Sequence, residues 1–155
     1  MKRPLGLFIL VAFAMLLQGT VCPAATRAVY VLPAVGSINP GLAEFIVAGI
    51  KEAEKQNAAA LVIQLDTPGG LDSSMRQIIQ AISNARVPVV VYVSPSGARA
   101  ASAGVFITQA AAVAAMAPGT NIGAAHPVSI GLGKMDKTME KKVLNDFVAY
   151  GRALA

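Results

Sequence analysis

Runs of consecutive apolar residues alternate along the chain with stretches in which apolar residues recur every three to four positions. The runs at 29–35, 60–65 and 87–93 predict β-strands, and the continuous apolar character of the third favours cover on both faces of a sheet. The stretches at 40–55 and 71–84 have the spacing of amphipathic helices. Four further segments follow: a helix over 101–111, a short strand over 113–116, a glycine-rich stretch over 119–137 and a helix from about 138 to the end.

These strands and helices alternate in units of roughly 25 to 30 residues. Such alternation is typical of an α/β fold with a mostly parallel sheet and right-handed crossovers. The last helix is still running at Ala155 without a capping residue. We therefore expect the domain that begins near residue 26 to be truncated at its C-terminus.

The first 25 residues have the three parts of a secretory signal peptide. Met1-Lys-Arg is basic, Leu5 to Leu17 is apolar, and small residues after Cys22 place a cleavage site behind Ala24 or Ala25. The apolar run has 13 residues, which is short for a membrane span. An uncleaved anchor, or lipidation at Cys22, is a weaker interpretation. We expect export to the periplasmic or other extracytoplasmic side.

Composition excludes several kinds of chemistry. The chain has 155 residues, of which 55% are hydrophobic and 14% are charged, and its net charge is +5. Removal of residues 1–25 leaves eleven basic against eight acidic residues, a net charge of +3, and no cysteine. Disulfides and a cysteine nucleophile are then impossible, and a single histidine argues against a structural zinc site. A net positive charge this small, in a chain with few aromatic residues, does not indicate nucleic-acid binding.

Two glycine-containing turns follow predicted strands. Thr67-Pro-Gly-Gly comes after the second strand, and its simplest role is a tight turn into the next helix. Its alternative role is to present the backbone N–H groups of Gly69 and Gly70 at the carboxyl edge of the sheet, where open α/β sheets bind ligands. An oxyanion hole needs such donors and a close approach of the substrate.

Ser102 stands among small residues after the third strand and near the start of a helix. Ala100, Ala101, Ala103 and Gly104 would equally suit close helix packing. If the second and third strands are parallel neighbours, however, Ser102 lies beside Gly69 and Gly70. That combination is typical of an acyl-transfer nucleophile.

A serine nucleophile needs a base, for which the chain offers His126 and four lysines. The lysines are Lys134, Lys137, Lys141 and Lys142. The apolar stripe of the last helix comprises Met139, Val143, Phe147, Tyr150 and Leu154. Helical phase puts Lys141 opposite this stripe and Lys142 beside it, where burial could favour the neutral amine. Asp146, four residues on, could instead pair with Lys142 and keep it charged.

His126 is the rival base, because an imidazole accepts a proton near neutral pH without strong burial. It would need a carboxylate to orient it, and none is evident downstream.

Three segments together resemble a known family. Asp66-Thr-Pro-Gly-Gly, Ala101-Ser-Ala-Gly and Met116-Ala-Pro-Gly-Thr-Asn-Ile-Gly-Ala-Ala-His-Pro, in this order, are similar to the N-terminal protease domain of NfeD-type membrane-bound serine proteases. These stomatin operon partner proteins are distant relatives of ClpP and of signal peptide peptidase A. The resemblance covers roughly residues 27–155.

The resemblance implies a ClpP/crotonase-like fold and a Ser–Lys dyad of Ser102 and Lys142. Gly69, Gly70 and the N–H of Ala103 would form the oxyanion hole, although ClpP relatives have a histidine base in about the place of His126. Apolar segments of membrane partners such as stomatin would be the substrates, without metal or cofactor. The resemblance further implies a homo-oligomer, a dimer, held at the membrane by segments beyond residue 155.

A serine endopeptidase is therefore the leading hypothesis. The first alternative is a non-catalytic scaffold that binds stomatin-like membrane proteins. The second is a crotonase-like acyl-CoA enzyme, against which the export signal argues.

Overall fold

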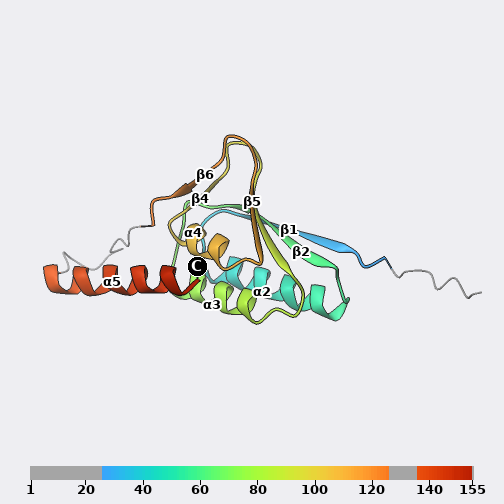
Figure 1. The fold of residues 1–155 in the computed structure, drawn as a ribbon, viewed down its shortest axis with the longest axis horizontal. Helices are drawn as coiled ribbons and strands as arrows, with labels where there is room; N and C mark the ends of the chain where they lie inside the picture. The colour runs from blue at the N-terminus through green and yellow to red at the C-terminus, as the bar shows by residue number, and fades with distance from the viewer. Residues whose placement is uncertain (1–25, 126–135, 155) are drawn as a thin grey trace, which may run out of the picture.

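The computed structural model describes residues 26–125 and 136–154 (Figure 1). Its elements in chain order are β1 (Val29–Val35), α2 (Pro40–Lys55), β2 (Ala60–Asp66), α3 (Asp72–Ser83), β3 (Val89–Val93), β4 (Arg99–Ala101), α4 (Ala103–Gln109), β5 (Val113–Met116), β6 (Asn121–Gly123) and α5 (Lys137–Leu154). The predicted helices and long strands are all present, with ends that differ by a few residues. Residues 1–25 and 126–135, which carry the signal-peptide prediction, His126 and Lys134, lie outside the described part.

Four parallel strands form the main sheet in the order β1-β2-β3-β5. The strands are in register, so that Tyr30 pairs with Leu61 and Leu61 with Val89. Each strand therefore lies beside the long strand that follows it in the chain, which is the arrangement that βα units produce. This confirms the predicted α/β class with a mostly parallel sheet.

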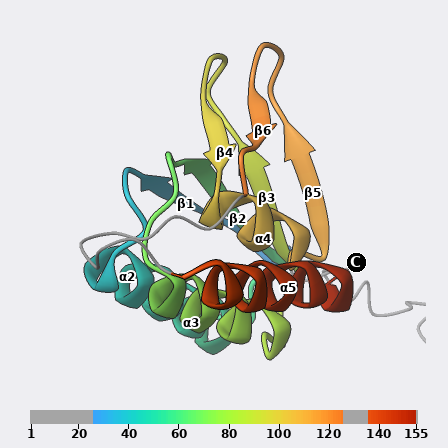
Figure 2. The ribbon, with the colours of Figure 1, turned by 90° about the vertical axis from the view of Figure 1, so that its left-hand side faces the viewer.

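The core lies between one face of this sheet and the helices. Figure 2 shows α2 and α3 in a layer beneath the strands, with α5 beside them and α4 between α5 and β3. Alternate residues of β2 and β3 face this layer and are buried. The buried apolar side chains that meet there include Leu61, Ile63, Leu65, Val89, Val91, Val93, Ile46, Ile50, Met75, Ile78, Ile79, Phe106 and Ile107.

The opposite face of the sheet is open in the described part of the chain. Val29 and Val31 of β1 are 56% and 57% exposed, and Val90 and Tyr92 of β3 are half-buried. The prediction that β3 is covered on both faces is therefore wrong for the described residues. The reason is that α2, α3 and α4 all pack on the same side of the sheet.

A second sheet of two short strands, β4 and β6, was not predicted. The Thr67 N–H donates to the Arg99 carbonyl at 2.7 Å, and the Ala101 N–H donates to the Thr67 carbonyl at 3.0 Å. These bonds attach β4 to the end of β2. The chain thus leaves β3 at Val93 and returns through β4, so Ser102 follows β4 and not β3 directly.

Helix α5 lies on the surface and is held largely by aromatic contacts. The Phe106 ring on α4 lies 5.5 Å from that of Phe147, edge to face, and 6.1 Å from that of Tyr150, stacked. Most of the predicted apolar stripe faces this contact, since Val143, Phe147, Tyr150 and Leu154 are partly buried. Met139, at 48% exposed, does not belong to it. No helix in residues 26–125 or 136–154 has the length and apolar character needed to span a membrane.

The packing of α2 on the sheet predicts that substitutions at two nearby positions differ strongly in their effect on the free energy of unfolding. Ile46 is fully buried, so Ile46→Ala should lower the free energy of unfolding by about 2–5 kcal/mol. Glu44→Ala, two residues away on the exposed side, should change it by no more than about 0.5 kcal/mol. Urea unfolding followed by circular dichroism measures both. Equal losses in the two variants would contradict the assignment of the core.

Candidate active site

The two turns singled out in the sequence meet at the carboxyl edge of the sheet. Gly69 has φ +112°, and a Cβ atom on it would lie 2.6 Å from the Cβ of Ser102 and 3.1 Å from its Oγ. Only a glycine permits this approach, for reasons of both space and backbone conformation. The predicted neighbourhood of Ser102 and the Gly69-Gly70 turn is therefore present.

Ser102 has an unusual backbone conformation for a residue with a side chain. Its φ is 53° and its ψ is −115°, and it occupies the N-cap of α4 without making a side-chain capping bond. Its N–H donates to the Gly123 carbonyl at 2.9 Å, so β6 supports the turn. Such strain costs on the order of 1–3 kcal/mol and persists mainly at functional sites. A strained strand–serine–helix turn that leaves the hydroxyl unbonded within the described residues suits a nucleophile.

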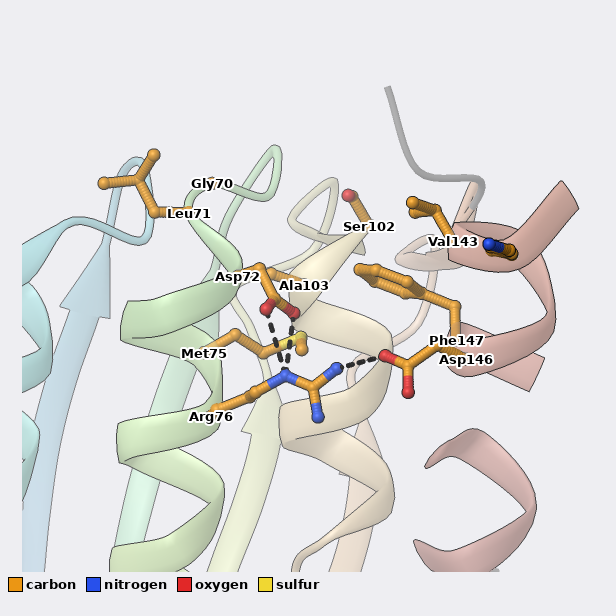
Figure 3. A pocket seen from close by; sticks show the side chains of 11 residues that line it. Gly70, Leu71, Asp72, Met75, Arg76, Ser102, Ala103, Val143, Asp146 and Phe147 are labelled. Atoms are coloured by element: carbon orange, nitrogen blue, oxygen red, sulfur yellow. Dashed lines mark hydrogen bonds and ion pairs between the residues drawn. The ribbon is translucent and has the colours of Figure 1, made fainter. Parts of the chain in front are cut away.

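The neighbouring small residues also serve packing. A Cβ on Gly104 would lie 2.7 Å from Cγ2 of Thr67 and 3.3 Å from Cβ of Ala100. The packing interpretation of this segment is therefore correct for Gly104. It does not account for Ser102, whose side chain points away from this contact toward the cavity shown in Figure 3.

The backbone donors around Ser102 are not equivalent. The Gly69 N–H donates to Oγ1 of Thr67 at 3.0 Å and is thereby occupied. The N–H groups of Gly70 and Ala103 make no hydrogen bond within residues 26–125 and 136–154, and both residues line the cavity beside Ser102. A Cβ on Gly70 would collide with the Ile38 carbonyl, so this position too requires glycine. Within the described residues, the N–H groups of Gly70 and Ala103 are therefore available to a ligand, that of Gly69 is not, and Gly69 provides space.

A cavity of about 580 Å³ opens beside Ser102 (Figure 3). Helices α3 and α5 contribute both apolar and charged side chains to its lining. The lining residues are Gly70, Leu71, Asp72, Met75, Arg76, Ser102, Ala103, Lys142, Val143, Asp146 and Phe147.

Lys142 lines the same cavity as Ser102, whereas Lys137 and Lys141 do not. The cavity thus distinguishes Lys142 from Lys141 as helical phase predicted. The expected burial is absent, however, because the Lys142 side chain is exposed in the described structure. Its position on the surface helix α5 is the reason.

Asp146 pairs with Arg76 and not with Lys142. Nη2 of Arg76 lies 2.7 Å from Oδ2 of Asp146, and its Nε lies 3.0 Å from Oδ2 of Asp72. The guanidinium also stands 4.4 Å above the ring centroid of Tyr150. This cluster was not predicted from the sequence. The four-residue spacing of Asp72 and Arg76 indicates one part of it, but the contact with Asp146 spans 70 positions and has no local signal.

The pKa values of Arg76 and Tyr150 are both raised in this cluster. Partial burial works against the charged guanidinium, but the carboxylates of Asp72 and Asp146 outweigh it and raise the pKa of Arg76. Burial also raises the pKa of the Tyr150 hydroxyl, against the opposing effect of Arg76. Because the ion pairs are more than a third exposed, each contributes only about 0–1 kcal/mol. The cluster therefore orients α5 more than it stabilises the fold.

In the part of the chain that the structure describes, no three histidine, cysteine or acidic side chains are grouped closely enough to hold a metal ion. The groups that the cavity itself presents are the Ser102 hydroxyl, backbone N–H groups and the charged side chains of α3 and α5.

Two curated proteins are similar to this chain in sequence. The membrane-bound protease PH1510 of Pyrococcus horikoshii is 41% identical over 133 residues, which is 84% of this chain and 30% of that protein. The membrane protein NfeD1b of Bacillus subtilis is 34% identical over 121 residues, 78% of this chain and 26% of that protein. This chain thus spans about a quarter to a third of the length of these relatives.

Solved structures agree with the fold. A serine-to-alanine mutant of the 1510-N membrane-bound stomatin-specific protease has a TM-score of 0.77 at 40% identity, covering 84% of this chain and 64% of that chain. A lysine-to-alanine mutant of the same protease, in complex with a substrate peptide, has a TM-score of 0.76 at 39% identity, covering 84% and 60%. ClpP1 of Listeria monocytogenes, at 21% identity and a TM-score of 0.59 over 80% of this chain and 67% of its own, shares the fold.

The resemblance suggested by the three sequence motifs is confirmed by these similarities. The profile of the NfeD1b N-terminal domain matches residues 28–145, which is most of the chain. The chain therefore belongs to the NfeD1b N-terminal domain family and has a ClpP-like fold.

Proposed function

We propose that this chain is the catalytic part of a serine endopeptidase in which Ser102 is the nucleophile and Lys142 the general base. The observation that carries the proposal is the geometry at Ser102. A strained serine stands beside two unbonded backbone N–H groups, and a lysine lines the same cavity. The relatives add support, because one is named a protease. The serine and the lysine replaced in the two solved mutants are about forty positions apart, as are Ser102 and Lys142.

The proposed reaction is acyl transfer to serine followed by hydrolysis. Neutral Nζ of Lys142 takes the proton of the Ser102 hydroxyl while Oγ attacks the peptide carbonyl carbon. The N–H groups of Gly70 and Ala103 stabilise the oxyanion that forms. The C–N bond then breaks, and the leaving amine takes the proton from Lys142. Water releases the acyl group from Ser102 in a second step of the same kind.

The walls of the cavity suggest which peptides bind. Leu71, Val143 and Phe147 present apolar surface next to Ser102, so an apolar side chain of the substrate would gain by entering. The two solved mutants are named as a stomatin-specific protease. We extend this to apolar segments of membrane-associated, stomatin-like proteins as substrates here.

Location and assembly follow from the same proposal. Residues 1–25 would act as an export signal, and the intact protein would be tethered to the membrane with its site on the extracytoplasmic side, as the names of the membrane-bound relatives suggest. A dimer remains the expected assembly.

One observation favours a second function. The Lys142 side chain is exposed, and a general base needs a setting that favours its neutral form. A non-catalytic scaffold that binds stomatin-like membrane proteins would have no such need. This alternative predicts a protein that binds its partner normally with Ser102→Ala and never cleaves it.

The nucleophile is tested by acylation with a fluorophosphonate probe on the full-length protein. Ser102→Ala should abolish labelling, because the attacking oxygen is removed. Ser96→Ala, in an exposed turn of the same chain, should label at the wild-type rate. Gel fluorescence and mass spectrometry of the labelled peptide measure both. Undiminished labelling of Ser102→Ala would refute the assignment.

The base is tested by comparing two adjacent lysines. Lys142→Ala should slow labelling by at least about 100-fold, the usual contribution of a general base. Lys141→Ala removes the same charge from the same helix outside the cavity and should have little effect. Labelling reactions quenched at a series of times give the rates. Full activity of Lys142→Ala combined with loss of activity in His126→Ala would assign the base to histidine.

Whether Gly69 provides the space for Ser102 is tested by comparing two glycines with nearly the same φ angle. Gly36 has φ +111° with nothing near its missing Cβ, whereas the Cβ of Gly69→Ala would strike Ser102. Gly36→Ala and Gly69→Ala should each lose about 1–3 kcal/mol of stability through backbone strain. Only Gly69→Ala should slow labelling, by about 100-fold, because it displaces the nucleophile. Equal labelling rates in two folded variants would contradict this role.

A further inference from the structure

Helix α5 carries Lys142, and few contacts determine where this helix lies. None of its described residues is buried. It touches α4 through the aromatic contacts of Phe106 with Phe147 and Tyr150. The side chain of Arg76, which reaches α5 from α3, makes a further contact. The position of Lys142 relative to Ser102 therefore depends in part on Arg76.

The guanidinium of Arg76 makes three contacts at once. It bonds Asp72 on its own helix and Asp146 on α5 (Figure 3). It also lies over the ring of Tyr150, one turn further along α5. A planar group with several N–H donors can do this, whereas the single ammonium of a lysine cannot match the same geometry. The contact with Asp72 fixes the direction of the side chain, so that Nη2 points at α5.

Asp146 would have another partner if Arg76 were absent. It lies four residues after Lys142, the spacing at which an acidic and a basic side chain pair on one face of a helix. In the described residues its ion pair is with Arg76, and no carboxylate lies within 4.0 Å of Nζ of Lys142. A carboxylate paired with Lys142 would favour the ammonium form and so oppose its action as a base.

We propose that Arg76 is a positioning residue of the active site: it sets α5 against α3 so that Lys142 lines the cavity, and it keeps Asp146 from pairing with Lys142. The inference rests on the proposed Ser102–Lys142 dyad. It goes further in naming a group, distant in sequence from both residues, that keeps the base available.

The charged groups that face Lys142 come from two helices. Asp72 and Arg76 lie on α3 and Asp146 on α5, and all three line the cavity with Lys142. Helix α4, which packs against α5, contributes no titratable side chain between Ala103 and Gln109. Loss of Arg76 would therefore leave the carboxylates of Asp72 and Asp146 without this ion-pair partner. Lys142 would then be the remaining cation among the described residues that line the cavity.

The test is the pH dependence of fluorophosphonate labelling in the full-length protein. Arg76→Gln should raise the pH of half-maximal labelling by about one unit, because a released carboxylate holds the proton on the base. The double variant Arg76→Gln/Asp146→Asn removes that carboxylate and should return the midpoint toward the wild-type value. Arg152→Gln, which takes one positive charge from an exposed position of α5 outside the cavity, should leave the profile unchanged.

A purely structural role for Arg76 would give a different result. Labelling would become slower at every pH with the same midpoint, and Asp146→Asn would not reverse the effect; this outcome overturns the claim that Arg76 keeps Asp146 from pairing with Lys142. An unchanged rate and midpoint in a folded Arg76→Gln protein overturns it as well. Circular dichroism establishes that the variants are folded.

A second measurement separates this inference from the proposed function. Amide hydrogen exchange of α5 should be faster in Arg76→Gln than in Arg152→Gln and the wild type, whether or not the probe labels Ser102. Faster exchange in a protein that the probe never labels would uphold the anchoring by Arg76 and refute the protease. Labelling at Ser102 with unchanged exchange and an unchanged midpoint would uphold the protease and refute the inference.

Discussion

The site depends on the close approach of two turns, one after β2 and one after β4. The Cβ of Ser102 occupies the space that a side chain on Gly69 would need, and the Ile38 carbonyl occupies the corresponding space at Gly70. Two consecutive positions without side chains thus allow three segments of backbone to converge at one edge of the sheet. A parallel sheet brings its strand ends to that edge, but a side chain at Gly69 would force Ser102 away from the turn.

The strain at Ser102 is maintained by hydrogen bonds on both sides of it. Before it, Ala101 donates to Thr67 at the end of β2; at Ser102 itself, the N–H is bound by Gly123 of β6. After it, the Val105 N–H bonds the Ser102 carbonyl and begins α4. The backbone N–H of Ser102 is therefore bonded, whereas its hydroxyl makes no hydrogen bond to any residue that the structure describes. The next N–H, that of Ala103, is also unbonded among these residues and is the donor that the proposed oxyanion hole would use.

Features of the fold and the site that depend on local sequence patterns could be predicted, whereas those that depend on contacts between distant residues could not. The long strands and helices have periodic patterns, and both glycine turns follow apolar runs, so their positions could be predicted and their proximity inferred. Strands β4 and β6 have three residues each and pair only with one another and with the end of β2, so no periodicity marks them. The unequal N–H groups of Gly69 and Gly70 depend on the side chain of Thr67, a detail of hydrogen bonding that residue type alone does not determine. The contact of Arg76 with Asp146 joins two helices that are 70 positions apart, whereas the local spacing of Asp146 points to Lys142.

The two halves of the proposed dyad are consequently held by different kinds of force. Ser102 is fixed by backbone bonds and by tight packing of Gly104 against Thr67, which change little with salt or pH. Lys142 is placed by aromatic contacts and exposed ion pairs on a helix without a buried residue, and such contacts are individually weak and screened by salt. Covering α5 would both fix Lys142 and favour its neutral form, because excluding water strengthens the ion pairs of Arg76 and disfavours an uncompensated ammonium. The alignment of the base with the serine is therefore the part of the site most sensitive to what packs on α5, whereas the nucleophile and the oxyanion donors belong to the body of the fold.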